Sequence, residues 1–249
     1  MIKLVLIRHG ETTYNRDSRF TGWTDVPLTK RGISEAHKAG KLLKSKKFTF
    51  DVAFTSVLDR AIDTTNIILK EMRLSNIKIV KDWHLNERHY GALQGLNKDE
   101  MAEKFGEGQV FKWRRGYDVR PPALKKNDKR WSGNNPKYRK FNKKYLPLTE
   151  SLKDTVERVV PYYNKSIAPL LKKGKRVLVS ASGNSLRGLV KYIDDISDDK
   201  ILSFTIPYGV PIVYELDGNL KPLKRYFLGN PKEIKKVIEE IEGQGKARK

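Results

Sequence analysis

The chain has 249 residues, with 51 lysines and arginines against 29 aspartates and glutamates, and a formal net charge of +22. The absence of cysteine excludes a disulfide framework, and no apolar run approaches the roughly 18 residues that a membrane-spanning helix needs. We therefore expect a cytoplasmic protein without a secretory leader, whose positive charge favours anionic partners, either small molecules or nucleic acid.

The order of elements along the chain predicts the fold class. Short apolar runs predict strands over residues 3–7, 51–55, 77–80, 176–180 and 212–216. Helical spacing of apolar residues predicts helices over 33–44, 61–72 and 186–193, and one over 152–171 that is interrupted at Pro161 or Pro169. Asp217-Gly218 predicts a hairpin between 212–216 and 220–228. We expect one α/β domain over 1–249, with a mostly parallel central sheet flanked by helices on both faces and one antiparallel edge or hairpin strand.

Residues 98–145 depart from the alternation of strands and helices. They carry 15 basic residues, 6 acidic residues and eight aromatic ones. We predict a basic insertion that folds over the edge of the sheet and over the candidate site. Basic residues interleaved with aromatic ones also fit single-stranded nucleic acid, but a small core formed by these aromatics is the favoured interpretation. From about residue 240 to 249 the polar, Gly-containing terminus predicts a mobile tail.

Four polar clusters stand where a predicted strand gives way to a loop or helix. The first begins with Arg8-His9-Gly10-Glu11, runs to Asn15 and continues at residues 20–25, and the others lie at residues 55–61, 85–98 and 180–188. Because ligands of open α/β sheets bind beyond the carboxyl ends of the strands, we expect the four clusters to converge. His9 then offers a ring nitrogen that can attack phosphorus, and Glu87 offers a carboxyl group that can act as acid or base.

The same clusters, together with two arginines of the insertion, supply positive charge and main-chain hydrogen-bond donors. The cations suited to phosphate or carboxylate groups are Arg8, Arg60, Lys98, Arg114 and Arg115. Main-chain amides near Gly22 and Gly183 can add anion-binding sites. The sequence has neither the spacing of a metal site nor a nucleotide-binding glycine loop. The set therefore predicts phosphoryl transfer through a phosphohistidine without a metal.

Several of these stretches together resemble cofactor-dependent phosphoglycerate mutase. They are residues 8–11, 21–28, 85–98, 113–115, 183–188 and 206–211. The resemblance spans about residues 3–228 and implies a phosphoglycerate-mutase-like fold. The Arg-His-Gly tripeptide alone is shared by the wider histidine phosphatase superfamily, whereas the long block from Leu85 and the basic insertion are more specific to the mutases.

The resemblance also implies an activity and a role for each site residue. It implies a glycolytic isomerase that interconverts 3-phosphoglycerate and 2-phosphoglycerate through a phosphohistidine at His9, primed by 2,3-bisphosphoglycerate. Glu87 would donate and accept the proton of the substrate hydroxyl. The phosphoryl group would be surrounded by Arg8, Asn15 and Arg60. Asn184 would supply a donor near it, and Gly183 would also bind the substrate. The rest of the substrate would be bound by Thr21, Gly22, Tyr90, Lys98, Arg114 and Arg115.

Expectations about partners follow from the same resemblance. It implies a homodimer or homotetramer and small phosphorylated acids as ligands. We expect no metal, no nucleic acid and no membrane as partners.

One position departs from the mutase pattern. The mutases have a second catalytic histidine before Gly-Asn-Ser, where this chain has Ser182, and no histidine of the neighbouring sequence replaces it. A protonated imidazole donates a charge-assisted hydrogen bond about twice as strong as a neutral one. We expect its loss to lower the rate by about 100- to 1000-fold. The first alternative is a phosphatase or phosphate-binding pseudoenzyme of the same fold. The second alternative is a basic protein that binds nucleic acid and is not an enzyme.

Overall fold

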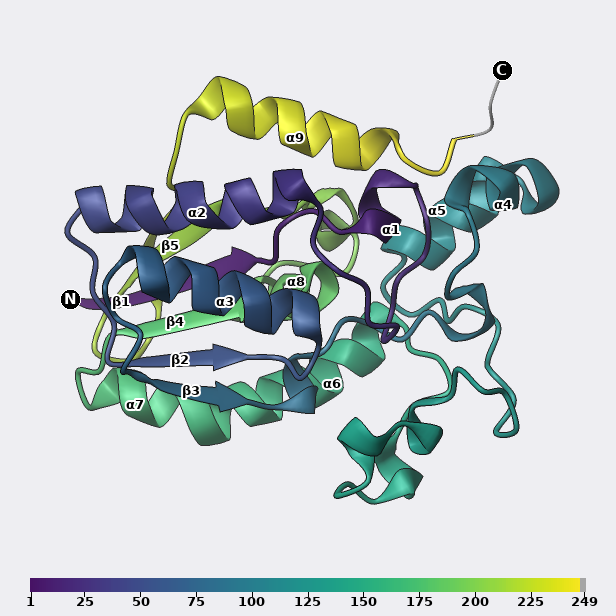
Figure 1. Cartoon of the computed structure of the whole chain (residues 1–249), viewed down its shortest axis with the longest axis horizontal. Coiled ribbons are helices and arrows are strands. Elements are labelled where there is room, and N and C mark those ends of the chain that lie inside the picture. The colour runs from purple at the N-terminus through teal and green to yellow at the C-terminus, as the bar shows by residue number, and fades with distance from the viewer. Residues whose placement is uncertain (247–249) are drawn as a thin grey trace.

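The structure, a computed structural model, describes residues 1–246 and is built around a six-stranded sheet (Figure 1). Its strands are β1 (Ile2–Arg8), β2 (Val52–Thr55), β3 (Lys78–Lys81), β4 (Val177–Ala181), β5 (Pro211–Leu216) and β6 (Pro222–Phe227). They lie in the order β3-β2-β4-β1-β5-β6. The first four of these are parallel, β5 runs antiparallel to β1, and β6 runs antiparallel to β5. The predicted parallel sheet with an antiparallel hairpin at one edge is confirmed.

Helices cover both faces of the sheet, as predicted. The α-helices are α1 (Thr13–Arg16), α2 (Lys30–Ser45), α3 (Asp59–Glu71), α4 (Lys98–Phe105), α5 (Glu107–Arg115), α6 (Leu152–Tyr162), α7 (Ala168–Lys172), α8 (Gly183–Ile193) and α9 (Pro231–Gly243). Alternation along β1 sends Leu4 and Leu6 into the core beneath α6, α7 and α8, and sends Val5 and Ile7 into the core beneath α2 and α3. Burial on both sides explains why β1 reads as a continuous apolar run.

The break in the long predicted helix falls between its two prolines rather than at either of them. Pro161 lies inside α6. A π-helical turn, Tyr163–Ile167, follows, and α7 begins next with Pro169 in its first turn. A proline is tolerated in the first turn of a helix because the amide hydrogen that it lacks would have no partner there.

The insertion contains α4, α5 and short 3₁₀ turns. The 3₁₀ turns of the described chain are Trp83–Leu85, Gly91–Leu93, Ser132–Asn134, Pro136–Tyr138, Lys143–Tyr145 and Lys200–Ser203. Trp113 packs in a small cluster with Phe20, and Tyr138 packs in another with Trp23. Other aromatics of the insertion are exposed, among them Phe105, Phe111 and Tyr145. The expected aromatic core therefore exists, but it is shared with the loop at residues 20–23.

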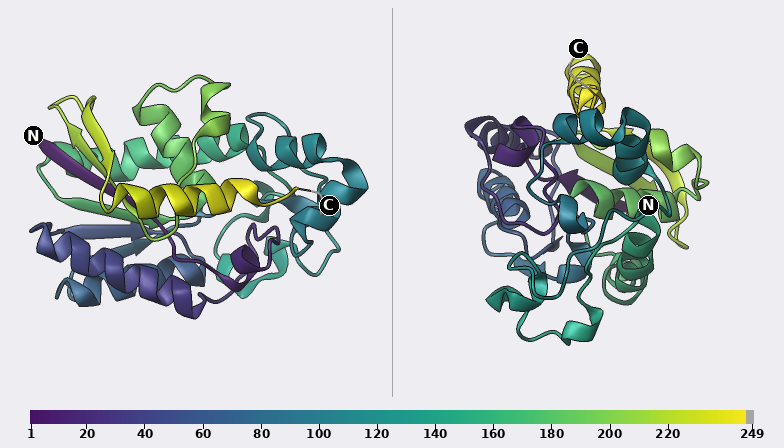
Figure 2. Two further views of the ribbon diagram at one scale, coloured as in Figure 1. Left: turned by 90° about the horizontal axis from the view of Figure 1, so that it is seen from above. Right: turned by 90° about the vertical axis from the view of Figure 1, so that its right-hand side faces the viewer.

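The C-terminal region differs from the predicted mobile tail. Residues 231–243 form α9, which runs along the outside of the molecule and ends beside the insertion (Figure 2). Ile234 and Ile241 of this helix are buried, and the Gln244 side chain donates a hydrogen bond to the carbonyl of Asn15. Residues 247–249 of the predicted tail lie outside the described residues. In the part of the chain that the structure describes, no helix could cross a membrane.

Candidate active site

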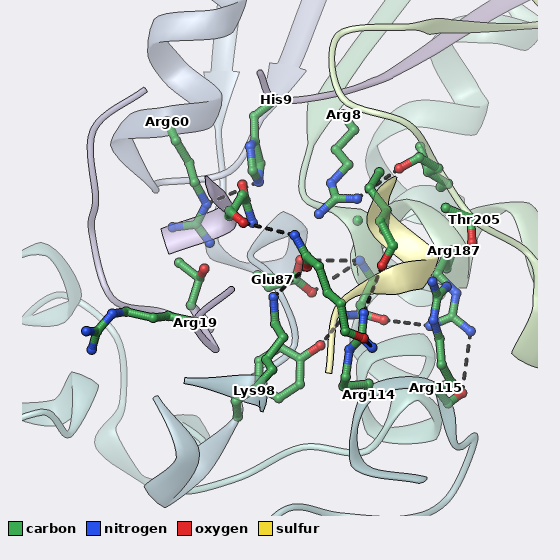
Figure 3. Close-up of a pocket in the computed structure, with 18 residues that line it drawn as sticks. Arg8, His9, Arg19, Arg60, Glu87, Lys98, Arg114, Arg115, Arg187 and Thr205 are labelled. Atoms are coloured by element: carbon green, nitrogen blue, oxygen red, sulfur yellow. Dashed lines mark hydrogen bonds between the residues drawn. The ribbon is translucent and has the colours of Figure 1, made fainter. Parts of the chain in front are cut away.

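The four polar clusters meet in one cavity at the carboxyl ends of β1, β2 and β4 (Figure 3). The predicted site residues that line it are Arg8, His9, Asn15, Thr21, Arg60, Glu87, Tyr90, Lys98, Arg114, Arg115, Gly183 and Asn184. Two predicted residues do not line the cavity, namely Gly22 and Ser182. The convergence expected from parallel strands is thus observed for most of the predicted site, while the role of each residue stays a prediction.

His9 is held as a neutral imidazole with one nitrogen available. Its Nδ1 lies 2.8 Å from the carbonyl oxygen of Gly10, which can only accept, so Nδ1 carries the proton. Nε2 is then the unprotonated nitrogen, and it accepts a hydrogen bond of 3.2 Å from Arg60. Burial, followed by the charges of Arg60 and Arg8, holds the pKa of His9 well below its usual value of 6.5. An unprotonated Nε2 is the form that a nucleophile requires.

Arg60 and Arg8 are fixed around this ring by main-chain carbonyls. Arg60, fully buried at the start of α3, donates to the carbonyls of Gly22 and Thr24 at 2.7 and 2.9 Å. Arg8 donates to the carbonyl of Ile206 at 2.9 Å, and its guanidinium lies over the Tyr208 ring. The Nε of Arg8 is buried without a hydrogen-bond partner in residues 1–246. Such an atom is a donor available to an anionic ligand.

Two glycines let the His9 loop lie against α2. A side chain at Gly10 would collide with the main-chain carbonyl of Gly32, and one at Gly32 would collide with the carbonyl of Glu11. The start of α2, where Thr29 caps the helix through the amide of Gly32, therefore touches the backbone beside His9 directly.

Glu87 lies opposite a helix N-terminus. Its Oε1 accepts hydrogen bonds from the main-chain amides of Arg88 and Asn184, at 2.7 and 3.1 Å. Asn184 lies in the first turn of α8, so the carboxylate faces the positive end of that helix. The side chain is buried and lines the same cavity as His9. This arrangement gives a carboxyl group a fixed position within the cavity.

A second group of cations, Lys98, Arg114 and Arg115, lines the cavity away from His9. In Figure 3 His9 and Arg60 lie on one side, whereas Arg114, Arg115 and Arg187 lie on the other. Burial, followed by the charge of Arg114, lowers the pKa of Lys98 well below its usual value. The pKa of Arg115 falls to about 10 for the same two reasons. Crowded, desolvated cations indicate a site built for a ligand with more than one negative charge.

Tyr90, Asn184 and Arg187 form a hydrogen-bonded chain across this end of the cavity. The Asn184 amide donates to the Tyr90 hydroxyl at 3.2 Å, and Arg187 donates to the Asn184 carbonyl oxygen at 2.8 Å. Burial, followed by Arg115, lowers the pKa of Arg187 to about 9. Burial raises the pKa of the Tyr90 hydroxyl, but the charge and hydrogen bond of Arg88, together with the charge of Arg114, outweigh it, and the pKa is lowered overall.

Gln244, just after α9, contacts the second group of cations. Its Oε1 accepts a hydrogen bond of 2.8 Å from Lys98, and its main-chain carbonyl accepts one from Arg114. Arg114 also donates to the carbonyl of Ile241 at 3.0 Å. Neutral oxygens thus occupy donors that the resemblance assigns to the substrate.

Ser182 and Gly22 lie behind the residues that line the cavity and do not line it themselves. Ser182 caps α8 by position, is fully buried, and has a hydroxyl without a partner among the described residues. Gly22 has φ +57°, and a side chain there would collide with Gln94. Its contribution is the carbonyl that holds Arg60.

Six lining residues were not predicted as part of the site. They are Arg19, Arg187, Thr205, Ile206, Ile241 and Gln244. Arg187 could have been found, because it lies three residues after Asn184 and so shares its helix face. Gln244 gave no such signal, since a polar, Gly-containing terminus is typical of a loop.

The donor set suits anions rather than metal ions. No group of three His, Asp or Glu side chains within residues 1–246 is placed to hold a metal. Unpaired buried donors at Arg8 Nε and Thr21 Oγ1, together with the cations, suit phosphate and carboxylate oxygens. The cavity therefore fits 2,3-bisphosphoglycerate by the chemistry of its donors.

Several solved structures share the fold. A mycobacterial glucosyl-3-phosphoglycerate phosphatase is 19% identical, covers 91% of this chain and 97% of its own, and has a TM-score of 0.68. A putative alpha-ribazole-5'-P phosphatase from Escherichia coli is 19% identical over 92% and 98% of the two chains, with a TM-score of 0.68. Phosphoglycerate mutase from Bacillus anthracis is 21% identical over 97% and 96%, with a TM-score of 0.62.

A family model covers the part of the chain that carries three of the four clusters. The model of the histidine phosphatase superfamily, branch 1, matches residues 4–131, which include His9, Arg60 and Glu87. This match agrees with a cavity in which a neutral, buried histidine is surrounded by arginines. The chain belongs to the histidine phosphatase superfamily.

Proposed function

We propose that the chain is a phosphoglycerate mutase that interconverts 3-phosphoglycerate and 2-phosphoglycerate through a phosphohistidine at His9. The observation that carries this proposal is the second group of cations, Lys98, Arg114 and Arg115, in the same cavity as His9. A phosphate monoester without a carboxylate needs only Arg8 and Arg60, the arginines at His9, to bind its phosphate. A phosphorylated acid also has a carboxylate, which a second cationic group can bind.

The residues would divide the work as follows. His9 Nε2 attacks phosphorus, and Arg8 and Arg60 stabilise the charge on the transferring group. Glu87 gives a proton to the departing oxygen and takes one from the hydroxyl that attacks phospho-His9. Lys98, Arg114 and Arg115 hold the carboxylate so that the reacting oxygen faces His9. When bound, 2,3-bisphosphoglycerate would supply the phosphoryl group that His9 carries.

A phosphatase acting on a small phosphorylated acid is the second candidate. Two observations favour it: Ser182 stands where the mutases have a histidine, and two of the three structures compared above are named as phosphatases. Both candidates use the same phosphohistidine, and they differ in whether a sugar-acid hydroxyl or water accepts the phosphoryl group.

One experiment separates the two candidates. The chain is incubated with 3-phosphoglycerate, with and without 2,3-bisphosphoglycerate, while 2-phosphoglycerate and inorganic phosphate are both measured. A mutase forms 2-phosphoglycerate faster than phosphate and depends on the bisphosphate, whereas a phosphatase releases phosphate alone. Intact-mass measurement should show one added phosphoryl group that is absent from His9→Asn. If the wild-type chain never carries a phosphoryl group, both candidates fail.

A further inference from the structure

We infer that the buried ion pair between Glu150 and Arg158 positions Glu87, so that Arg158 is a positioning residue for the proton-transfer step. This inference rests on the proposed function, because it assigns Glu87 the acid–base role. Neither member of the pair lines the cavity. Their effect on the reaction would therefore act through the main chain that carries Glu87.

The segment that carries Glu87 has little regular structure to hold it. A 3₁₀ turn, Trp83–Leu85, precedes Glu87, and the next, Gly91–Leu93, follows it. No strand pairs with residues 86–90 in the described structure. Its main-chain groups must therefore find other partners.

Arg158, on α6, supplies those partners. Its Nη1 donates to the carbonyl of His84 at 2.6 Å. Its Nη2 donates to the carbonyls of Asn86 and Glu87, at 3.0 and 2.9 Å. One guanidinium thus binds three carbonyls within four residues. The Glu87 carbonyl also accepts a hydrogen bond of 2.5 Å from the indole of Trp23.

Glu150 orients this guanidinium and binds the other end of the segment. Its carboxylate accepts from Arg158 through both oxygens, at 2.6 and 2.9 Å. It also accepts from the main-chain amide of His89 at 2.8 Å, and the Glu150 amide donates to the His89 carbonyl at 2.8 Å. The pair therefore holds the main chain on both sides of Glu87.

Burial makes this arrangement rigid. The side chains of Arg158 and Glu150 are only 8% and 5% exposed. Because the two side chains are almost completely buried, each broken contact leaves a charge or carbonyl unpaired, so the geometry has little freedom. A lysine keeps the charge but cannot reproduce the planar fork that reaches three carbonyls and a carboxylate together. A carboxyl group that moves by about 1 Å can lose about 100-fold in proton transfer.

The test uses two substrates that differ in their need for an acid. A phosphate ester of an alcohol, such as glycerol 3-phosphate, which like 4-nitrophenyl phosphate has no carboxylate, has a poor leaving group that must be protonated as it departs. 4-Nitrophenyl phosphate has a good leaving group that departs without a proton. The ratio of kcat/KM for phosphate release from the two esters therefore reports on Glu87, since kcat/KM covers the steps up to leaving-group release.

Three variants weaken the pair to different degrees: Arg158→Met, Arg158→Lys and Glu150→Gln. We expect each to lower the ratio of alkyl to aryl kcat/KM by about 10- to 100-fold, as Glu87→Gln does, with a smaller change on the aryl ester. Arg120→Met is the matched control, because exposed Arg120 forms an ion pair with Asp154, which lies on α6 as Arg158 does. This control should leave the ratio unchanged.

Several outcomes would overturn the inference. Equal losses on both esters in Glu150→Gln, with its Tm within a few degrees of wild type, would mean that the pair is merely structural. An unchanged ratio in Arg158→Lys and Glu150→Gln would mean that Glu87 needs no such support. If Arg158→Met does not fold, the other two variants decide. A wild-type chain without phosphohistidine would instead overturn the proposed function, and this inference with it.

Discussion

The two ends of the cavity are built differently. At the phosphoryl end, Arg8 and His9 lie at the carboxyl end of β1, and Arg60 begins a helix that packs on the sheet. At the other end, the recognition end, where we propose that the acid is recognised, Lys98, Arg114 and Arg115 come from the helices of the insertion, and Gln244 follows the last helix. The sheet thus fixes His9, while segments outside it supply the charges that, in our proposal, bind the carboxylate. Substitutions at the two ends should therefore have separable effects.

The largest effect is expected at the phosphoryl end, from Ser182→His. The longer imidazolium side chain would reach from this position, behind the wall, into the cavity and add a charge-assisted donor beside the transferring group, and we expect mutase turnover to rise by about 100- to 1000-fold. A coupled assay with 3-phosphoglycerate and 2,3-bisphosphoglycerate measures it. Ser182→Ala is the control and should change the rate by only a few-fold. An unchanged or lower rate in a folded Ser182→His chain contradicts the account of Ser182.

At the recognition end, Arg114→Leu should weaken binding of the acid without removing the chemistry. A lost hydrogen bond between charged groups corresponds to about 10- to 100-fold in KM for 3-phosphoglycerate. The kcat/KM for 4-nitrophenyl phosphate, which has no carboxylate, should change little. Lys104→Met removes an exposed charge from the same insertion and serves as control. Equal losses on both substrates would break the distinction between the two ends.

A smaller effect, of opposite sign, is expected from Gln244→Ala. Its oxygens occupy Lys98 and Arg114, so an incoming carboxylate must displace them. Gln244→Ala removes the hydrogen bond to Lys98 and keeps the main-chain carbonyl on Arg114, and it should lower KM for 3-phosphoglycerate by about 2- to 10-fold. Steady-state kinetics measure the change. A raised KM would mean that Gln244 binds the ligand instead of competing with it.

The smallest expected effect compares two buried histidines, His9 in the cavity and His89 outside it. Burial holds the pKa of His9 well below 6.5, and burial followed by Arg158 lowers the pKa of His89 to about 3. Both pKa values are depressed on folding, so each histidine contributes stability that is present above pH 6.5 and lost as the pH falls. As the pH is lowered from 6.5 to 5.5, each histidine should lower the free energy of unfolding by about 1 kcal/mol.

Urea unfolding of His89→Gln tests this contribution. The wild-type loss between pH 6.5 and 5.5 should exceed that of the variant by about 1 kcal/mol. His37→Gln is the control, since His37 is a partly exposed residue on α2. Identical pH dependence in wild type and His89→Gln would mean that folding does not lower the pKa of His89.

The contrast between the two ends also explains how far the sequence could be interpreted. The phosphoryl end was predictable because His9 and Ser182 directly follow apolar strands whose order forces them together. Nothing comparable locates the insertion, so the residues identify Arg114 and Arg115 only as cations suited to anions, and the resemblance alone assigned them to the substrate. The helix α9 could have been predicted from Ile234, Ile238 and Ile241, which follow the Asn230 cap at helical spacing. The contact of Gln244 with Lys98 depends on how α9 packs, and local sequence does not encode that.

The contact between Gly10 and Gly32 has a consequence for how this chain can evolve. A Cβ atom at Gly10 would collide with the carbonyl of Gly32, and one at Gly32 would collide with the carbonyl of Glu11. Neither position therefore accepts even a methyl group unless α2 shifts away from the His9 loop. The glycine beside His9 is thus constrained by a helix that takes no part in the chemistry. Across homologues we expect both positions to stay glycine together, and a chain that has lost the one at α2 to have lost phosphoryl transfer as well.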